Sequence, residues 1–214
     1  MSVKKELYFR LISELKKTNS TLVAVSKTKP IEDILELYNL GQRDFGENYV
    51  QELVDKQAQL PKDIRWHFVG HLQSNKVKYI APFVHLIHGV DSIKLLKEIN
   101  KEAAKNNRII DVLLQVHIAQ EETKFGFNKE ELQTAIKEVL QSVQVCGLMG
   151  MASFSDEINK VRNELKHLKL LYDQYSQFSI LSMGMSGDYK IAVEEGSTMV
   201  RIGSLLFGER DYHK

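Results

Sequence analysis

The chain has 214 residues, of which 43% are hydrophobic and 27% are charged, and its formal net charge at pH 7 is +1. These values are typical of a globular protein, and so small a charge excludes a general attraction to nucleic acid or to a membrane surface. The single cysteine, Cys146, lies in an apolar run, excludes an internal disulfide and suits a reducing compartment. With no apolar run near the roughly 20 residues of a membrane span, we expect one cytoplasmic domain over residues 1–214.

The opening stretch, MSVKKELYFRLISELKK, is predicted to form an amphipathic helix. Apolar residues recur there at helical spacing, at Leu7, Leu11, Ile12 and Leu15, and charges run throughout, unlike a secretory signal. Eight short apolar runs follow and predict β-strands: LVAVS (22–26), DFGEN (44–48), WHFVG (66–70), HLIHGV (85–90), IIDVLLQVHI (109–118), VQVCGLMGM (143–151), ILSMGM (180–185) and MVRIGSLLFG (199–208).

Longer amphipathic stretches separate these runs and predict helices. Ser92 precedes one of them, and Asn128, with Glu131 three residues later, precedes another; both are residue types that cap helix starts. Strands that alternate with helices pair in parallel, so the predicted fold class is α/β. Eight repeats favour a closed (β/α)8 TIM barrel with an extra N-terminal helix. A doubly wound open sheet is the alternative, but no GxGxxG motif follows the first strand.

Functional side chains of such a barrel gather where the strands end, at their carboxyl ends. The sequence places the following residues there: Lys27 and Lys29 after strand one, Glu47 and Asn48 after strand two, His71, Gln73, Ser74 and Asn75 after strand three, Lys124 after strand five, Met149 and Met151 at the end of strand six, Ser186 after strand seven, and Arg201, Gly203 and Ser204 in and after strand eight. Lysine, arginine, amides, hydroxyls and glycines with little acid suit an anionic ligand that also carries an electrophile.

The stretch AVSKTKP sets a lysine directly after an apolar strand. Such a lysine is usually a solvated surface charge, but at a barrel mouth it can lose part of its hydration. The pKa of its ammonium group then falls, and a nucleophilic amine becomes available for Schiff-base chemistry. The spacing alone does not choose between Lys27 and Lys29.

Arg201 stands in the apolar run TMVRIGSLL, where an arginine is rarely buried without a partner. One interpretation is a structural salt bridge, and the other is a fixed donor that points into the barrel mouth. Gly203 and Ser204 would then offer backbone N–H groups to a phosphate, to which Ser186 would add a hydroxyl, although glycines there also suit ordinary tight turns.

The histidines and the cysteine indicate no particular functional site. No HExxH pair and no cysteine cluster is present, so a metal site has little support. His67, in WHFVGH, is interpreted as a packed core histidine and His71 as a loop residue. Cys146 is interpreted as a core thiol rather than a nucleophile.

Several segments together resemble the pyridoxal phosphate homeostasis proteins, which are relatives of the alanine racemase barrel. The matching segments run in family order from residue 22 to residue 210: AVSKTKP, FGENYVQE, WHFVGHLQSNK, KFGF, GLMGMA and LSMGMSGDYKIAVEEGSTMVRIGSLLFGER. The resemblance implies a (β/α)8 barrel of the third fold type of pyridoxal-phosphate proteins, like the N-terminal domain of alanine racemase. It also implies that the chain binds pyridoxal 5'-phosphate and buffers or carries it without catalytic turnover.

The resemblance further assigns roles to individual residues. It implies that Lys27, rather than Lys29, forms the Schiff base, and that Arg201 faces the pyridine nitrogen. The phosphate would be held by Ser186, Gly203 and Ser204. The ring would be lined by Asn48 and Met151.

Two other functions stay open beside the carrier. An amino-acid racemase that uses pyridoxal phosphate needs a second acid or base on the opposite face of the ring, for which Tyr49 or Tyr189 are the candidates. An aldolase that forms a lysine imine with a phosphorylated sugar needs no cofactor and would show no visible absorption band. For the carrier we expect a monomer that delivers the cofactor to pyridoxal-phosphate-dependent apo-enzymes.

Overall fold

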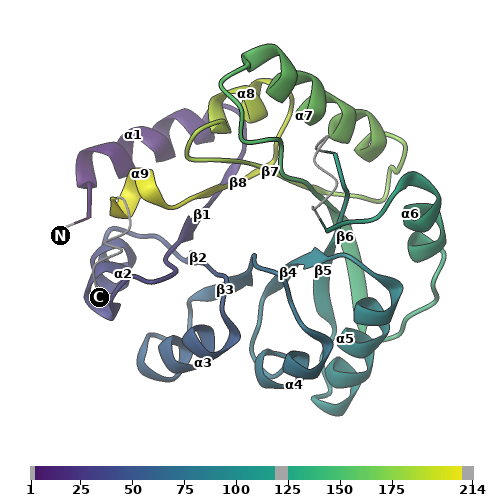
Figure 1. Cartoon of the computed structure of the whole chain (residues 1–214). Coiled ribbons are helices and arrows are strands. Elements are labelled where there is room, and N and C mark those ends of the chain that lie inside the picture. Colours follow the sequence, from purple (N-terminus) through teal and green to yellow (C-terminus); the bar gives the residue numbers. More distant parts are fainter. Residues whose placement is uncertain (1–2, 119–124, 209–214) are drawn as a thin grey trace.

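The computed structural model describes residues 3–118 and 125–208, within which eight parallel strands form a closed barrel (Figure 1). The strands are β1 (Thr21–Val25), β2 (Asp44–Glu47), β3 (Arg65–Phe68), β4 (Leu86–Val90), β5 (Ile110–Gln115), β6 (Val143–Met149), β7 (Ile180–Met185) and β8 (Met199–Ile202). Each strand pairs with its neighbour in the chain, and β1 pairs with β8 to close the barrel. Lys124 lies outside the described residues.

Helices connect the strands and cover the barrel from outside. They are α1 (Lys5–Lys16), α2 (Ile31–Asn39), α3 (Val50–Gln59), α4 (Val77–Ile80) after a 3₁₀ turn η1 (Ser74–Lys76), α5 (Ile93–Lys105), α6 (Lys129–Ile136), α7 (Ile158–Tyr172), α8 (Tyr189–Glu194) and α9 (Ser204–Phe207). The (β/α)8 barrel with an additional helix in front, predicted from the sequence, is confirmed.

The start signals for two of these helices are also confirmed. The Ser92 side chain accepts a hydrogen bond from the backbone N–H of Leu95 and caps α5. Asn128 and Glu131 form a reciprocal capping box at the start of α6. The last apolar run, over residues 199–208, contains more than a strand, because β8 ends at Ile202, before Gly203 as expected, and the chain then forms α9. Leu206 and Phe207 of α9 are buried, so apolar residues continue through the turn.

The N-terminal helix α1 packs on β1 and on α9. Its buried side chains are Tyr8, Leu11 and Leu15, one turn apart along one face. The backbone N–H of Lys4 donates to the carbonyl of Leu206 in α9 at 3.0 Å. This helix therefore supports the segment that follows β8.

Apolar side chains fill two regions of the core. The larger region lies between the strands and the surrounding helices. The smaller one lies inside the barrel and draws residues from β1, β4, β5, β6 and β8, namely Val23, Leu86, Leu113, Cys146, Met149 and Met199. Strands β6 and β7 approach closely at Gly147, where an added Cβ would lie 1.8 Å from the carbonyl oxygen of Ile180. Only glycine fits there.

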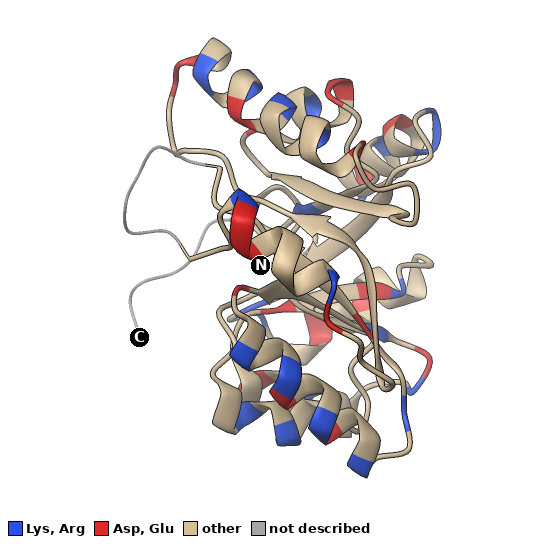
Figure 2. Ribbon diagram, turned by 90° about the vertical axis from the view of Figure 1, so that its right-hand side faces the viewer, with Lys and Arg blue, Asp and Glu red and all other residues tan. Residues whose placement is uncertain are grey.

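Charged residues lie mainly on the outer helices, where Figure 2 shows both signs interspersed. None of the helices within residues 3–118 and 125–208 is long and apolar enough to cross a membrane.

Candidate functional site

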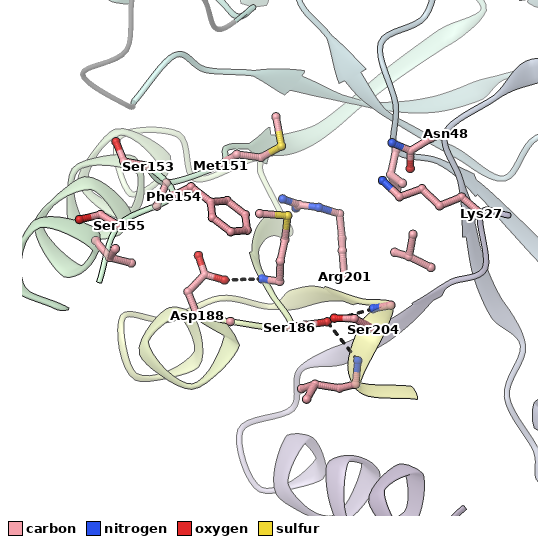
Figure 3. A pocket seen from close by; sticks show the side chains of 18 of the residues that line it. Lys27, Asn48, Met151, Ser153, Phe154, Ser155, Ser186, Asp188, Arg201 and Ser204 are labelled. Carbon is pink, nitrogen blue, oxygen red and sulfur yellow. Dashed lines mark hydrogen bonds between the residues drawn. The ribbon is translucent and has the colours of Figure 1, made fainter. Parts of the chain in front are cut away.

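A cavity of about 770 Å³ lies at the carboxyl ends of the strands (Figure 3). The structure brings together on it all the residues to which the sequence assigns cofactor binding, which come from the ends of β1, β2, β6, β7 and β8: Lys27, Asn48, Met151, Ser186, Arg201, Gly203 and Ser204. Figure 3 shows the side chains of Lys27, Asn48 and Arg201 directed toward the middle of this cavity. Their assignment to a cofactor stays a prediction.

The chain around Lys27 is anchored on both sides. The hydroxyl of Ser26 donates to Glu47 Oε1 at 2.6 Å, and the backbone N–H of Thr28 donates to Glu52 Oε1 at 2.6 Å. Thr28 has a φ of +63°, a backbone conformation that is costly for a β-branched residue and persists only where its surroundings impose it. The loop therefore holds Lys27 in one backbone position.

Lys29 lies on the same cavity but makes a different contact. Its Nζ donates to the carbonyl of Phe207 at 3.0 Å, which ties the loop after β1 to the end of α9. This hydrogen bond favours a structural role for Lys29.

Glu47 does not line the cavity, contrary to what its position after strand two suggests. It is fully buried toward α3, where Lys56 Nζ donates to its Oε1 at 2.8 Å and also to the carbonyl of Ser26 at 2.8 Å. Burial raises the pKa of Glu47 to about 7, although the Lys56 ammonium group acts in the opposite direction. Glu47 and Lys56 thus support the Lys27 loop from behind.

Other residues expected at the strand ends lie elsewhere. His71 and Gln73 line a second cavity of about 420 Å³, which also borders Asn48. Met149 packs inside the barrel. Ser74 begins the 3₁₀ turn η1 and, like Asn75, lines neither cavity.

Arg201 is buried at the base of the cavity. Its Nη1 donates to Ser182 Oγ at 2.6 Å and its Nη2 donates to the carbonyl of Gly150 at 3.1 Å. Burial lowers the pKa of its guanidinium group to about 10, with a smaller opposing effect of Asp188. No carboxylate among residues 3–118 and 125–208 forms an ion pair with it, which argues against a structural salt bridge and favours the donor interpretation.

Hydroxyl and backbone N–H groups converge beside Arg201. Ser186 Oγ accepts hydrogen bonds from the N–H groups of Gly203 at 3.3 Å and Leu205 at 3.5 Å. Both distances are long for this type of bond, so an anion with stronger acceptor oxygens would compete well for the same donors.

Sequence reasoning missed part of the cavity wall. Ser153, Phe154 and Ser155 line it, as does Asp188, whose Oδ1 accepts from the N–H of Met185 at 2.6 Å. The first three lie two to four residues after the strand-six run, so the strand-end rule would have found them if it had been extended along the loop that follows the run. Phe154 is 95% exposed at the rim of the cavity.

Polar side chains inside the barrel were also largely missed. His67 is buried, as predicted, but both of its ring nitrogens are hydrogen-bonded, to His88 and to Asp44. The available signal was a polar residue at an inward position of an apolar run, as in LIHGV and ILSMGM.

Asp44, His67 and His85 have ligand atoms within 4.8 Å of one another, a spacing compatible with a metal ion. Arg65, however, donates two hydrogen bonds to the Asp44 carboxylate. A cation already neutralises that group, which opposes a divalent metal ion at the same place.

The fold and the cavity define the class of the protein: a (β/α)8 barrel with a lysine, a buried arginine, and hydroxyl and backbone N–H groups at the carboxyl ends of its strands. The family model of the alanine racemase N-terminal domain matches residues 9–211. A pyridoxal phosphate homeostasis protein of Aquifex aeolicus is 45% identical over 199 residues, 89% of this chain and 87% of the relative. The human protein of that name is 40% identical over 218 residues, 90% and 78% of the two chains.

A solved structure is also similar to this chain over almost its whole length. PipY of Synechococcus elongatus, whose structure has pyridoxal phosphate bound, superimposes with a TM-score of 0.86 at 34% identity and covers 94% of this chain and 100% of its own. The chain therefore belongs to the family of the pyridoxal phosphate homeostasis proteins.

Proposed function

We propose that the chain binds pyridoxal 5'-phosphate as a Schiff base on Lys27 and acts as a carrier or buffer in intracellular vitamin B6 homeostasis. The observation that carries the proposal is one cavity in which Lys27, a buried Arg201 without a carboxylate partner among the described residues, and converging hydroxyl and N–H donors meet. The presence of bound pyridoxal phosphate in PipY and the names of the relatives support it.

The residues of the cavity fit this cofactor chemically. Pyridoxal phosphate supplies an aldehyde, a phosphate and a ring nitrogen, and the aldehyde condenses with a lysine amine with loss of one water molecule. Asn48 Oδ1 is buried and accepts no hydrogen bond from the described residues, so a polar ligand in the cavity would satisfy it. Ser186, Gly203 and Ser204 offer a hydroxyl and backbone donors suited to the phosphate.

Arg201 would face the ring nitrogen as a hydrogen-bond donor. A guanidinium group beside that nitrogen disfavours protonation of the ring, because two cations would then be in contact. An unprotonated ring withdraws electrons poorly, so aminotransferase-type chemistry is disfavoured. Met151 and Asn48 would line the ring from β6 and β2.

Racemase activity is the alternative, and the tyrosines argue against it. Tyr189 donates its hydroxyl to Glu14 of α1 at 3.0 Å, and it does not line the cavity that holds Lys27. Tyr49 lines the second cavity and is 54% exposed. Neither candidate thus offers a second acid or base beside Lys27, which favours a carrier over a racemase. We propose, as the family resemblance led us to expect, that this carrier is a monomer and delivers the cofactor to apo-enzymes.

The test is the absorption spectrum of the purified protein after addition of pyridoxal phosphate. We expect a visible band that is lost in Lys27→Ala and kept in Lys29→Ala, the matched control on the same cavity. If the band survives in Lys27→Ala and disappears in Lys29→Ala, the assignment of the lysine is wrong.

Addition of L-alanine then separates the carrier from the racemase. The carrier leaves the chirality of the alanine unchanged, whereas appearance of D-alanine in the wild type, but not in Lys27→Ala, would establish the racemase. Transfer is tested by mixing the loaded protein with an apo-enzyme and measuring the activity that the enzyme regains. If the wild type forms no band at all, the aldolase that uses a phosphorylated sugar takes the place of the carrier.

A further inference from the structure

A line of hydrogen-bonded polar side chains crosses the interior of the barrel, where this fold normally packs apolar residues. Arg201 Nη1 donates to Ser182 Oγ at 2.6 Å, and His88 Nδ1 lies 2.9 Å from the same oxygen. His88 Nε2 lies 2.9 Å from His67 Nδ1, and His67 Nε2 lies 3.0 Å from Asp44 Oδ1. The line joins β8, β7, β4, β3 and β2, and all five side chains are buried.

The donors and acceptors along this line have one consistent order. Arginine only donates, so Ser182 Oγ accepts from Arg201 and its own proton goes to His88 Nδ1. A neutral His88 then carries its proton on Nε2 and donates it to His67 Nδ1. His67 in turn carries its proton on Nε2 and donates it to the Asp44 carboxylate. Every group in the chain is then satisfied.

The competing order is unfavourable. A doubly protonated His67 would donate to His88, which would then donate to Ser182 Oγ in addition to Arg201. The Ser182 hydroxyl would accept twice, and its proton would find no further acceptor among its contacts in the described structure. Burial, together with the nearby His67 and Arg201, holds the pKa of His88 well below its ordinary value, in agreement with a neutral ring.

The hydrogen-bonded line ends on an anion, the Asp44 carboxylate, at the amino-terminal rim of the barrel. Asp44 and Arg65 are the first residues of their strands, and Arg65 donates to both carboxylate oxygens of Asp44, at 2.7 and 2.5 Å. Burial alone would raise the pKa of Asp44, but hydrogen bonds from Arg65 and His67 outweigh it and hold the pKa well below its usual range. Asp44 is therefore ionised, as the proton order requires.

We propose that Ser182, His88, His67 and Asp44 are positioning residues for Arg201, which hold its guanidinium group toward the cavity through a hydrogen-bond chain of fixed proton order. A buried cation is costly unless it is paired, and here aligned hydroxyl and imidazole dipoles connect it to a distant carboxylate. The proposal rests on the proposed function, since it is the cofactor ring nitrogen that Arg201 would meet. It makes Asp44, at the opposite end of the barrel, a determinant of the cofactor site.

The proton order is tested without cofactor, by ¹⁵N NMR of protein labelled at histidine, with signals assigned by replacing each histidine in turn. At pH 7 we expect both His67 and His88 to be neutral with the proton on Nε2. In Ser182→Ala the Nδ1 resonance of His88 should shift, because that nitrogen loses its donor. A proton on Nδ1 of either ring, or a doubly protonated ring, would overturn the proposal.

The positioning role is tested on protein loaded with pyridoxal phosphate. In Ser182→Ala we expect a change in the pH at which the visible band titrates and release of the cofactor about tenfold faster, as loss of one hydrogen bond to a charged group implies. Asp44→Asn keeps an acceptor for His67 but removes the charge. It should therefore change the pH at which the band titrates in the same direction as Ser182→Ala, by a smaller amount. If Ser182→Ala does not fold, the Asp44→Asn variant alone serves as the test.

The matched control is Ser197→Ala. The Ser197 hydroxyl is buried like that of Ser182, but its partners among the described residues are all backbone carbonyls, including that of Met183 at 2.7 Å. If Ser182→Ala and Ser197→Ala lower the melting temperature alike and neither changes the absorption band, the hydrogen-bonded side chains have only a structural role and the proposal fails. If the wild type itself binds no cofactor, the proposed function fails, and the NMR result alone decides the hydrogen-bond order.

Discussion

Glu47 has the most unusual environment of the residues that support Lys27. It is fully buried, and its Oε1 accepts from both Ser26 and Lys56, while its Oε2 has no hydrogen-bond partner among the described residues. A carboxylate oxygen left in this state is costly, which is the physical reason for the raised pKa of about 7. Protonation of Glu47 would relieve that cost without removing its bonds to the Lys27 loop.

The raised pKa predicts a pH-dependent stability. In the unfolded chain this carboxyl ionises near its ordinary pKa of 4.5, so between pH 4.5 and about 7 only the folded protein keeps the proton. The free energy of unfolding therefore falls as pH rises through this window and stops falling above it. Relative to Glu47→Gln, which cannot ionise, the wild type should lose on the order of 1–3 kcal/mol between pH 5 and pH 8.

Urea unfolding of both proteins at several pH values measures this difference. The comparison removes the contribution of the other titrating groups, which the two proteins share. A difference that stays constant over the whole range would show that Glu47 is ionised at pH 5 already.

Among the elements, β6 and β7 depend on a single glycine. Because an added Cβ at Gly147 would lie 1.8 Å from a backbone oxygen of Ile180, no side-chain movement relieves the contact, and one strand has to shift. We expect Gly147→Ala to lower the free energy of unfolding by about 3 kcal/mol or more. The same substitution at Gly187, where a Cβ meets nothing within 4 Å, should change it little. Thermal unfolding of the two variants checks this, and equal melting temperatures would contradict it.

Local signals predicted the elements well because each depends on residues close in sequence. Each of the eight strands begins within one residue of the start of its apolar run, and Ser92 and Asn128 mark the starts of α5 and α6 by bonds that reach three residues along the sequence. The helix α9 that follows β8 was not predicted. It has only four residues, and the buried Leu206 and Phe207 continue the apolar run, so no change in periodicity marks the start of the helix.

The sequence selected part of the cavity lining, but it predicted neither the rest of the wall nor the contacts between the residues. The strand-end rule and the family resemblance together selected residues from Lys27 to Ser204 that line one cavity. The hydrogen-bonded line from Arg201 to Asp44 could not be predicted from the sequence. Its members lie on different strands, and the register of the closed barrel brings them together. The outward direction of Glu47 likewise depends on the pleat of β2 and not on its place at the end of that strand.

For the whole molecule, cofactor binding should appear as added stability. A ligand that binds only the folded protein at a concentration of 100 Kd adds about 2.7 kcal/mol. For a chain of this size that corresponds to a rise in melting temperature of about 5–10 °C. We expect this rise on addition of pyridoxal phosphate, a smaller one in Lys27→Ala, and partial reversal by excess inorganic phosphate, which competes at Ser186. An equal rise in both proteins would mean that Lys27 forms no bond to the cofactor.

The state of Cys146 makes the proposed encounter with apo-enzymes directly measurable. The thiol is buried, and burial, with Asp111 nearby, raises its pKa to about 12, so thiol-directed dyes will not react with it in the folded protein. As the chain has one cysteine, a new one at an exposed position such as Val139, which is 92% exposed, would be labelled selectively without removal of the native residue. A fluorophore there would report encounters with apo-enzymes through its anisotropy while leaving the cavity untouched.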